Sequence, residues 1–293
     1  MFGFLVVDKS EGITSRRAVD MVKKLVRPAK IGHAGTLDPI ATGVLVLCIG
    51  PATRLAQYVQ QMPKTYVGDF KLGVTSVSDD IESELQAVPS APTISREQLN
   101  GVLGQFIGNI SQTPPAFSAV KVDGKRAYKL SRAGQTVALK PKTVTVDKID
   151  VLEFEYPDLK LRIQCGSGTY IRSIGRDVGI ALGSGAVMTA LNRSAIGSFD
   201  LATAISTQNI DANNLNNKLI SPLAAFPGCQ SKTLDVEQIA KLKNGHVFAA
   251  SELECDNNCE RIIGLDQQDN LLAVFGPHKT GTFKPELNFA SFY

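Results

Sequence analysis

A glycine-rich loop at residues 30–43 most constrains how this chain can fold, because it presents a carboxylate from an unusual backbone. Its sequence is Lys30-Ile31-Gly32-His33-Ala34-Gly35-Thr36-Leu37-Asp38-Pro39-Ile40-Ala41-Thr42-Gly43. The glycines allow tight turns, and the proline after Asp38 disfavours a helical backbone at that residue. An isolated Asp-Pro pair is usually only a turn. Here it stands directly before an apolar strand at 44–49, so we expect Asp38 to be displayed at a fixed place in the fold.

Composition indicates a soluble globular protein with one large and one small domain. The chain has 293 residues, of which 43% are hydrophobic and 20% charged. No apolar run is long enough to span a membrane. The cysteines form neither a disulfide framework nor a zinc pattern, since Cys255 and Cys259 have no second ligand pair nearby. We therefore expect a cytoplasmic protein without a metal.

Basic residues are concentrated between positions 119 and 148, although the net charge is only +3. Phe117 and Tyr128 lie in or beside this stretch. It could be a solvated surface hairpin, or it could grip a polyanion, whose phosphates release counterions when they are neutralised. The clustering favours the second interpretation. The basic residues are Lys121, Lys125, Arg126, Lys129, Arg132, Lys140, Lys142 and Lys148.

The hydrophobic pattern predicts a mixture of strands and helices without an internal repeat. Apolar residues at helical spacing predict a helix over 15–26 that Ser15 could cap. Alternation predicts a strand over 65–72 with Tyr66, Phe70 and Leu72 on one face. Further strands are expected at 2–8, 44–49, 117–122, 143–155 and 158–165, and further helices at 52–61, 95–106 and from Gly168 to about 182. Residues 74–93 are expected to be loop.

Few residues are available for chemistry. The three histidines form no metal-binding cluster, and there is no phosphate-binding loop, dinucleotide fingerprint or serine-nucleophile elbow. Hydride transfer, phosphoryl transfer, zinc hydrolysis and serine hydrolysis are therefore disfavoured. What remains is a solitary aspartate, two tyrosines and an arginine on separate elements, together with the basic stretch.

Several segments, in chain order, resemble the signature motifs of the TruB family of tRNA pseudouridine synthases. The resemblance extends through the basic stretch, where Pro114-Pro115-Ala116-Phe117-Ser118 leads to Gly124-Lys125-Arg126, and to a tail from Ser221 onward that looks like a PUA-type RNA-binding domain. Three positions depart from the family pattern, namely Ser10, Val77 and Asn192. The matching motifs are Asp8-Lys9-Ser10-Glu11-Gly12-Ile13-Thr14-Ser15, the Asp38 loop, Lys64-Thr65-Tyr66, Cys165-Gly166-Ser167-Gly168-Thr169-Tyr170-Ile171-Arg172-Ser173 and Leu191-Asn192-Arg193.

The resemblance implies an α+β pseudouridine-synthase fold, a mixed and largely antiparallel sheet flanked by helices. It implies a catalytic domain at 1–210 with an RNA-gripping insertion at about 111–148, a linker at 211–221, and a small β-rich PUA-like domain at 222–293. It also implies an isomerase that converts uridine 55 in the TΨC arm of tRNA to pseudouridine without any cofactor. The target base must be flipped out of its stack. We expect tRNA as the partner and a monomeric enzyme.

The resemblance also assigns roles to individual residues. Asp38 would be the catalytic nucleophile or base, and the weak basicity of a carboxylate favours the nucleophile, whether it attacks the sugar or the base. Arg172 would pair with Asp38 and favour its ionised form. Asp80 would belong to the same network, although the segment around Val77 departs from the family pattern. Tyr66 would be a second catalytic residue, which stacks on the flipped uracil and receives or relays the proton from C5.

The remaining assignments concern substrate binding. Tyr170 and Leu191 would line the base pocket, and His33 would contact the region of the displaced nucleotide. The insertion would bind RNA through Lys121, Lys125, Arg126 and Lys129.

Two other functions are compatible with the same motifs. One is a non-catalytic tRNA-binding or folding protein on this scaffold, which would not need Asp38, Tyr66 and Arg172. The other is a guide-RNA-dependent synthase, like the archaeal and eukaryotic relatives of the family. The stand-alone length and the basic hairpin argue against that second alternative.

Overall fold

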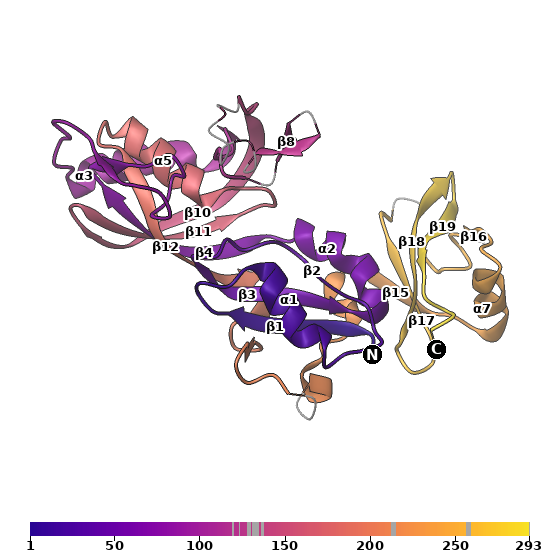
Figure 1. Ribbon diagram of the computed structural model, residues 1–293. Coiled ribbons are helices and arrows are strands. Elements are labelled where there is room, and N and C mark those ends of the chain that lie inside the picture. The colour runs from indigo at the N-terminus through magenta and orange to yellow at the C-terminus, as the bar shows by residue number, and fades with distance from the viewer. Residues whose placement is uncertain are drawn as a thin grey trace.

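The computed structural model of the protein describes residues 1–118, 120–122, 124–127, 130, 135, 138–211, 215–255 and 259–292. Within these residues the strands form one large mixed sheet, one smaller C-terminal sheet and two separate short hairpins (Figure 1). The helices are α1 (Ser15–Lys23), α2 (Ala56–Gln61), α3 (Arg96–Leu103), α5 (Ile171–Ala181) and α7 (Val236–Lys243). Short 3-10 helices are η1 (Gly50–Leu55), η2 (Gly104–Phe106), η3 (Asn216–Lys218) and η4 (Pro222–Ala225). This arrangement confirms the predicted α+β class.

The large sheet is mostly antiparallel. Only the β1–β14 and β3–β12 pairs within its described part are parallel. Short strands β2 (Ile31–His33) and β13 (Phe199–Asp200) pair with β3 and β12. The main strand order is β14 (Ile205–Ser206), β1 (Gly3–Lys9), β3 (Ala41–Ile49), β12 (Ala186–Ile196), β4 (Lys64–Leu72), β11 (Asp158–Cys165), β10 (Lys142–Glu155) and β7 (Gly108–Gln112).

Strand β4 lies in the middle of this sheet and follows the predicted alternation. Tyr66, Phe70 and Leu72 are all buried on one face. Because successive side chains of a strand point to opposite sides, this face packs into the main core while the other stays partly exposed. The prediction for these three residues is confirmed.

The structure corrects several local predictions. Thr14, not Ser15, caps helix α1, and the Thr14 side chain accepts a hydrogen bond from the Arg17 backbone. The predicted helix over 52–61 begins as the 3-10 helix η1, and the predicted loop over 74–93 contains a hairpin of β5 (Val74–Thr75) and β6 (Gln86–Ala87).

The hydrophobic pattern of the sequence does not predict the central strand β12. Polar Thr189, Asn192, Arg193 and Ser194 interrupt its apolar residues, so period-two alternation is weak. Helix α7 in the C-terminal part was missed as well.

The C-terminal sheet packs against the N-terminal half of the chain, and Figure 1 shows it, in yellow, beside η1, α2 and the start of β1. Phe2 contacts Phe289, and Tyr58 contacts Phe226, through their rings. Arg54 lies over the Phe289 ring and donates a hydrogen bond of 2.8 Å to the carbonyl of Asn288. The strand order is β15 (Gln230–Thr233), β17 (Ile262–Leu265), β18 (Leu271–Lys279), β19 (Thr282–Asn288) and β16 (Phe248–Ala249).

The proposed domain boundaries at 210 and 221 stay a prediction, since one apolar cluster includes residues from both parts of the chain. None of the helices in the described ranges combines the length and apolar character that crossing a bilayer requires.

Candidate active site

The loop that carries Asp38 is tied to its surroundings on both sides of the aspartate. The Ser15 hydroxyl accepts from the Leu37 backbone N–H at 2.8 Å and donates to the Leu37 carbonyl at 3.0 Å. The Pro39 carbonyl accepts from the Gly12 N–H at 2.9 Å and lies 3.3 Å from Lys9 Nζ. The Asp38 carbonyl accepts from the Ala41 N–H at 3.1 Å. Asp38 is thus presented from a loop with little freedom to move.

Lys9 is a functional candidate that the pattern analysis did not single out. Its side chain is fully buried at the end of β1 and donates to the carbonyls of Ser10 and Ile13 as well as Pro39. Burial lowers the pKa of its ammonium group, and the neighbouring Asp38 carboxylate opposes that shift. The available signal was a lysine that continues the alternation of the apolar residues Leu5 and Val7, because lysine is rarely buried without partners.

Asp38, Arg172 and Asp80 form a chain of ion pairs. The Asp38 Oδ2 atom lies 2.9 Å from Arg172 Nη2, and Asp80 Oδ2 lies 3.2 Å from Arg172 Nη1. The Asp38 side chain is 39% exposed, whereas those of Arg172 and Asp80 are 6% and 1% exposed. The structure therefore brings together three residues that are far apart in sequence, with the Asp38 carboxylate at the open end.

Arg172 is held in place by more than its two carboxylates. Its Nη1 atom donates to the Ser78 carbonyl and its Nη2 atom to the Phe117 carbonyl, both at 3.0 Å. Asp80 is fixed in turn by the Ser78 hydroxyl at 2.5 Å and the Glu82 N–H at 3.0 Å, both donating to Oδ1. Because the planar guanidinium can make several directional bonds at once, these contacts orient the group that faces Asp38.

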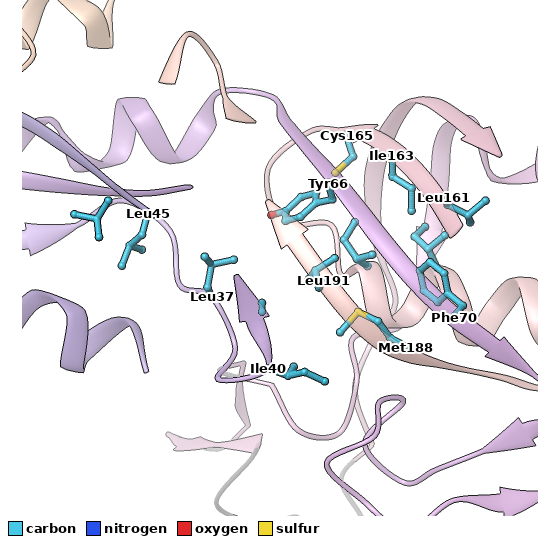
Figure 2. Packing of buried hydrophobic residues seen from close by; sticks show 14 of the residues in the cluster. Leu37, Ile40, Leu45, Tyr66, Phe70, Leu161, Ile163, Cys165, Met188 and Leu191 are labelled. Carbon is cyan, nitrogen blue, oxygen red and sulfur yellow. The ribbon is translucent and has the colours of Figure 1, made fainter. Parts of the chain in front are cut away.

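Tyr66 and Leu191 lie on the neighbouring strands β4 and β12. Both are buried in the main apolar cluster, which also contains Leu37 and Ile40 of the Asp38 loop (Figure 2). Burial raises the pKa of the Tyr66 hydroxyl, and the positive charge of Arg193 opposes that effect. The structure thus places an aromatic ring and an aliphatic side chain on the sheet beside the loop, as a base pocket requires.

Tyr170 lies at the start of helix α5, two residues before Arg172. Its backbone is held by the Gln112 side chain, which accepts from the Tyr170 N–H at 2.8 Å and donates to its carbonyl at 3.0 Å. The Lys142 ammonium lies 4.8 Å from the centre of the Tyr170 ring. Burial raises the pKa of the Tyr170 hydroxyl, with an opposing contribution from Ser118.

His33 lies on β2, opposite Leu47 of β3. It is half-buried, and burial lowers the pKa of its imidazole, with a backbone hydrogen bond at Gly35 opposing the shift. Among the described residues, the ion pairs of Asp38 and Arg172 do not include the His33 side chain. Its predicted contact with a displaced nucleotide stays a prediction.

The predicted RNA-binding hairpin is described only as backbone. Strand β8 (Lys121–Val122) pairs with β9 (Lys125–Arg126), so that Lys121 lies opposite Arg126. The side chains of these residues, and Lys129 altogether, lie outside the described part of the chain. Their role as an RNA grip stays a prediction. Across the ranges that are described, no group of histidine, cysteine and carboxylate side chains is placed to hold a metal ion.

The three departures from the family pattern have identifiable places. The Ser10 hydroxyl shares a hydrogen bond of 3.0 Å with Thr207. Asn192 donates to the Thr42 hydroxyl at 2.9 Å, near the C-terminal end of the Asp38 loop. Val77 is 68% exposed and belongs to the turn that carries Asp80. Despite that departure, the turn delivers Asp80 to Arg172.

Comparison with known proteins agrees with this geometry. The model of the TruB family pseudouridylate synthases (N terminal domain) matches residues 23–171. A tRNA pseudouridine synthase B from Dehalococcoides mccartyi strain 195 is 37% identical over 295 residues, which cover 99% of this chain and 97% of that protein. A second one, from Parabacteroides distasonis, is 48% identical over 189 residues, or 64% of this chain and 80% of that protein.

Solved structures show the same architecture. The crystal structure of a Cbf5-Nop10-Gar1 complex matches with a TM-score of 0.73 at 26% identity, covering 96% of this chain and 79% of that one. A structure of an H/ACA RNP bound to a substrate RNA containing 2'-deoxyuridine has the same fold, with a TM-score of 0.71 at 23% identity, covering 98% and 85%. From its motifs, its fold and its relatives, this chain belongs to the TruB family of pseudouridylate synthases.

Proposed function

We propose that this chain is an isomerase that converts uridine to pseudouridine in tRNA, at position 55 of the TΨC arm. The observation that carries the proposal is the Asp38–Arg172–Asp80 chain of ion pairs, which leaves one partly exposed carboxylate on a rigid loop. Relatives named tRNA pseudouridine synthase B, similar over almost the whole chain, supply the substrate class.

The reaction breaks the bond between uracil N1 and ribose C1′ and forms a bond between uracil C5 and C1′. The proton on C5 is lost, and N1 ends with a proton, so the product is an isomer of the substrate. We assign the Asp38 carboxylate as the nucleophile rather than the general base, because a carboxylate is a weak proton acceptor at neutral pH. The bond that Asp38 forms to the substrate breaks again when C5 joins C1′, so the enzyme is regenerated. Arg172 holds this carboxylate in one orientation at 2.9 Å.

The other site residues bind the base that has left its stack. Tyr66 stacks on the uracil, while Leu191 and Tyr170 close the pocket around it. Tyr66 and Leu191 are buried, which helps to exclude water that would otherwise compete with the uracil for ribose C1′ after the glycosidic bond breaks. Base flipping costs a few kcal/mol, which stacking and phosphate contacts must offset.

The purified chain, incubated with a tRNA transcript carrying C5-tritiated uridine and no other RNA, tests this proposal. We expect tritium release of one equivalent per tRNA, and none from a transcript with cytidine at position 55 but otherwise identical. Release from both transcripts would contradict the position. Absence of release from the transcript with uridine at position 55 would contradict the proposed reaction.

The same assay separates the two alternative functions. A tRNA-folding protein would bind the transcript without releasing tritium, although the buried Arg172 and Asp80 have no evident use in such a protein. A guide-dependent synthase would need added guide RNA. The 37% identity to a tRNA pseudouridine synthase B along 97% of its length favours the stand-alone enzyme over the Cbf5 type, which matches at 26%.

The basic hairpin is expected to bind tRNA phosphates. Replacing Lys125, Arg126 and Lys129 together by alanine should weaken tRNA binding, because three counterion-releasing contacts are lost. The slope of log K against log salt concentration should become shallower by about two to three units. Filter binding across a salt series measures this, with Lys24→Ala at the exposed end of α1, outside the expected RNA-binding parts, as the control. An unchanged slope would remove the hairpin from the RNA interface.

We also infer a monomer acting in the cytoplasm, where tRNA is processed. A single chain supplies Asp38, Arg172 and Asp80.

A further inference from the structure

Arg193 is an arginine in the middle of the large sheet that the proposed reaction does not yet use. It lies on β12, two residues after Leu191, and is only 2% exposed. A buried cation is unfavourable unless its donors are satisfied. The groups that satisfy this one therefore show what it does.

The Arg193 guanidinium donates to backbone carbonyls that precede and follow Asp38 in the chain. Its Nη2 atom donates to the Gly35 carbonyl at 3.0 Å, and Nη1 lies 3.5 Å from the Thr36 carbonyl. On the far side of the loop, Nε donates to the Val44 carbonyl at 2.8 Å. These three hydrogen bonds from one planar guanidinium, here called the Arg193 fork, therefore connect the backbone before Asp38 to the backbone after it.

Two glycines show how closely the loop lies on Arg193. Gly43 pairs with Arg193 in the parallel β3–β12 ladder, and a Cβ atom at Gly43 would lie 2.3 Å from the Arg193 carbonyl oxygen. Gly35 has a φ of +104°, and a Cβ there would lie 3.5 Å from Arg193 Nη1. The backbone on either side of the loop thus rests on the same residue.

Arg193 also faces the tyrosine of the site. In the antiparallel β12–β4 ladder Arg193 lies opposite Tyr66. Because opposed residues of neighbouring strands point to the same face, the guanidinium lies beside the Tyr66 side chain. Burial raises the pKa of the Tyr66 hydroxyl, and the Arg193 charge and a hydrogen bond from it lower the same pKa. One side chain therefore contacts both the loop of the nucleophile and the residue that stacks on the base.

We propose that Arg193 is a positioning residue that sets the place of the Asp38 loop relative to Tyr66 and Arg172 during uridine isomerisation. This inference rests on the proposed function for its effect on rate. Without the fork, the loop keeps its contacts to Ser15 and Lys9 but loses those that hold Gly35, Thr36 and Val44 together. A displacement of the nucleophile by about 1 Å is enough to lower a rate about 100-fold.

The variant Arg193→Lys tests this role, because lysine keeps the charge and cannot reproduce the fork. We expect the single-turnover rate of tritium release to fall about 100-fold while the dissociation constant for tRNA stays within about threefold. Arg54→Lys is the matched control, since it also removes an arginine contact to a backbone carbonyl, but on the C-terminal sheet. Its rate should stay within about twofold of the unmodified chain. A rate within threefold for Arg193→Lys would overturn the proposal.

A measurement independent of activity separates this inference from the proposed function. Amide hydrogen exchange should accelerate in Arg193→Lys over residues 34–41, which contain the N–H groups of Ala34, Leu37 and Ala41, and stay unchanged in α7. If the unmodified chain releases no tritium, the proposed function fails, and exchange alone decides the role of Arg193. Unaltered exchange over 34–41 would overturn it.

A second variant covers the case in which Arg193→Lys does not fold. Gly35→Ala disturbs the same contact from the loop side, since alanine is strained at a φ of +104°. We expect at least a tenfold lower rate with unchanged tRNA binding. A rate within threefold of the unmodified chain would again overturn the proposal.

Discussion

Replacing Asp38 with asparagine is expected to lower the rate of tritium release from C5-labelled tRNA by at least about 10⁴-fold. The amide is nearly the same size as the carboxylate but is not a nucleophile. Since the Asp38 side chain is 39% exposed and its loop is held by backbone contacts, the fold should survive. The tRNA dissociation constant should stay within about threefold, because Asp38 contributes chemistry rather than phosphate contacts.

The matched control for this prediction is Asp20→Asn. Asp20 lies on α1, and its one ion pair among the described residues is with the exposed Arg16. Losing the Asp20 charge should therefore leave the rate within about twofold of the unmodified chain. Rates are compared under single-turnover conditions with enzyme in excess, which separates chemistry from tRNA release. Substantial tritium release by Asp38→Asn, free of contaminating synthase, would refute the role assigned to Asp38.

Replacing Arg172 with methionine is expected to have the second largest effect, a loss of about 10²–10³-fold in rate. The Asp38 carboxylate would lose the partner that holds it at 2.9 Å. The buried Asp80 would also lose its counter-charge, which destabilises the fold by about 3–5 kcal/mol. Rate and stability therefore fall together in this variant, and the two effects must be separated.

A double variant separates them. In Arg172→Met with Asp80→Asn the buried negative charge is removed, so part of the lost stability should return while the rate stays low. Chemical denaturation measures the first effect and single-turnover tritium release the second. If the rate recovered in parallel with stability, Arg172 would be a structural residue only.

Arg176 provides the matched control for Arg172. It lies one turn further along α5 and pairs with Asp79 at 2.9 Å and Asp177 at 2.8 Å, next to the same turn. It makes no ion pair with Asp38 among the described residues. Arg176→Met should thus reduce stability and leave the rate within about fivefold. An equal loss of rate in both variants would mean that the integrity of the helix, rather than the contact to Asp38, is what matters.

The local parts of the site could be predicted from sequence. The Asp38 loop carries its own conformational signals, namely glycines and an Asp-Pro pair, and such turn chemistry acts over a few residues. The alternation in β4 is equally local, which is why Tyr66 was placed on the buried face correctly. The link between Asp38 and Arg172 came from the resemblance to a family, not from any pattern in the chain.

Contacts over long sequence distances could not be predicted in this way. Serine favours the N-cap position of a helix, which predicts Ser15 as the cap of α1. In the structure Thr14 caps the helix, and the Ser15 hydroxyl bonds to the backbone of Leu37 instead. Strand β12 has too many polar residues for a strand pattern, because Arg193 and Asn192 on it serve the Asp38 loop. In both cases a tertiary hydrogen bond outweighs a local preference.

The sequence by itself determined that this chain displays one carboxylate from a rigid turn, and which family its motifs resemble. The tertiary structure alone decided which charges surround that carboxylate. Asp38, Asp80 and Arg172 are distant in sequence and meet only because the large sheet brings their elements together. Buried charges need partners from elsewhere in the chain, and no local pattern records where those partners are. Arg193 shows the same principle, since its function follows from the carbonyls that it reaches.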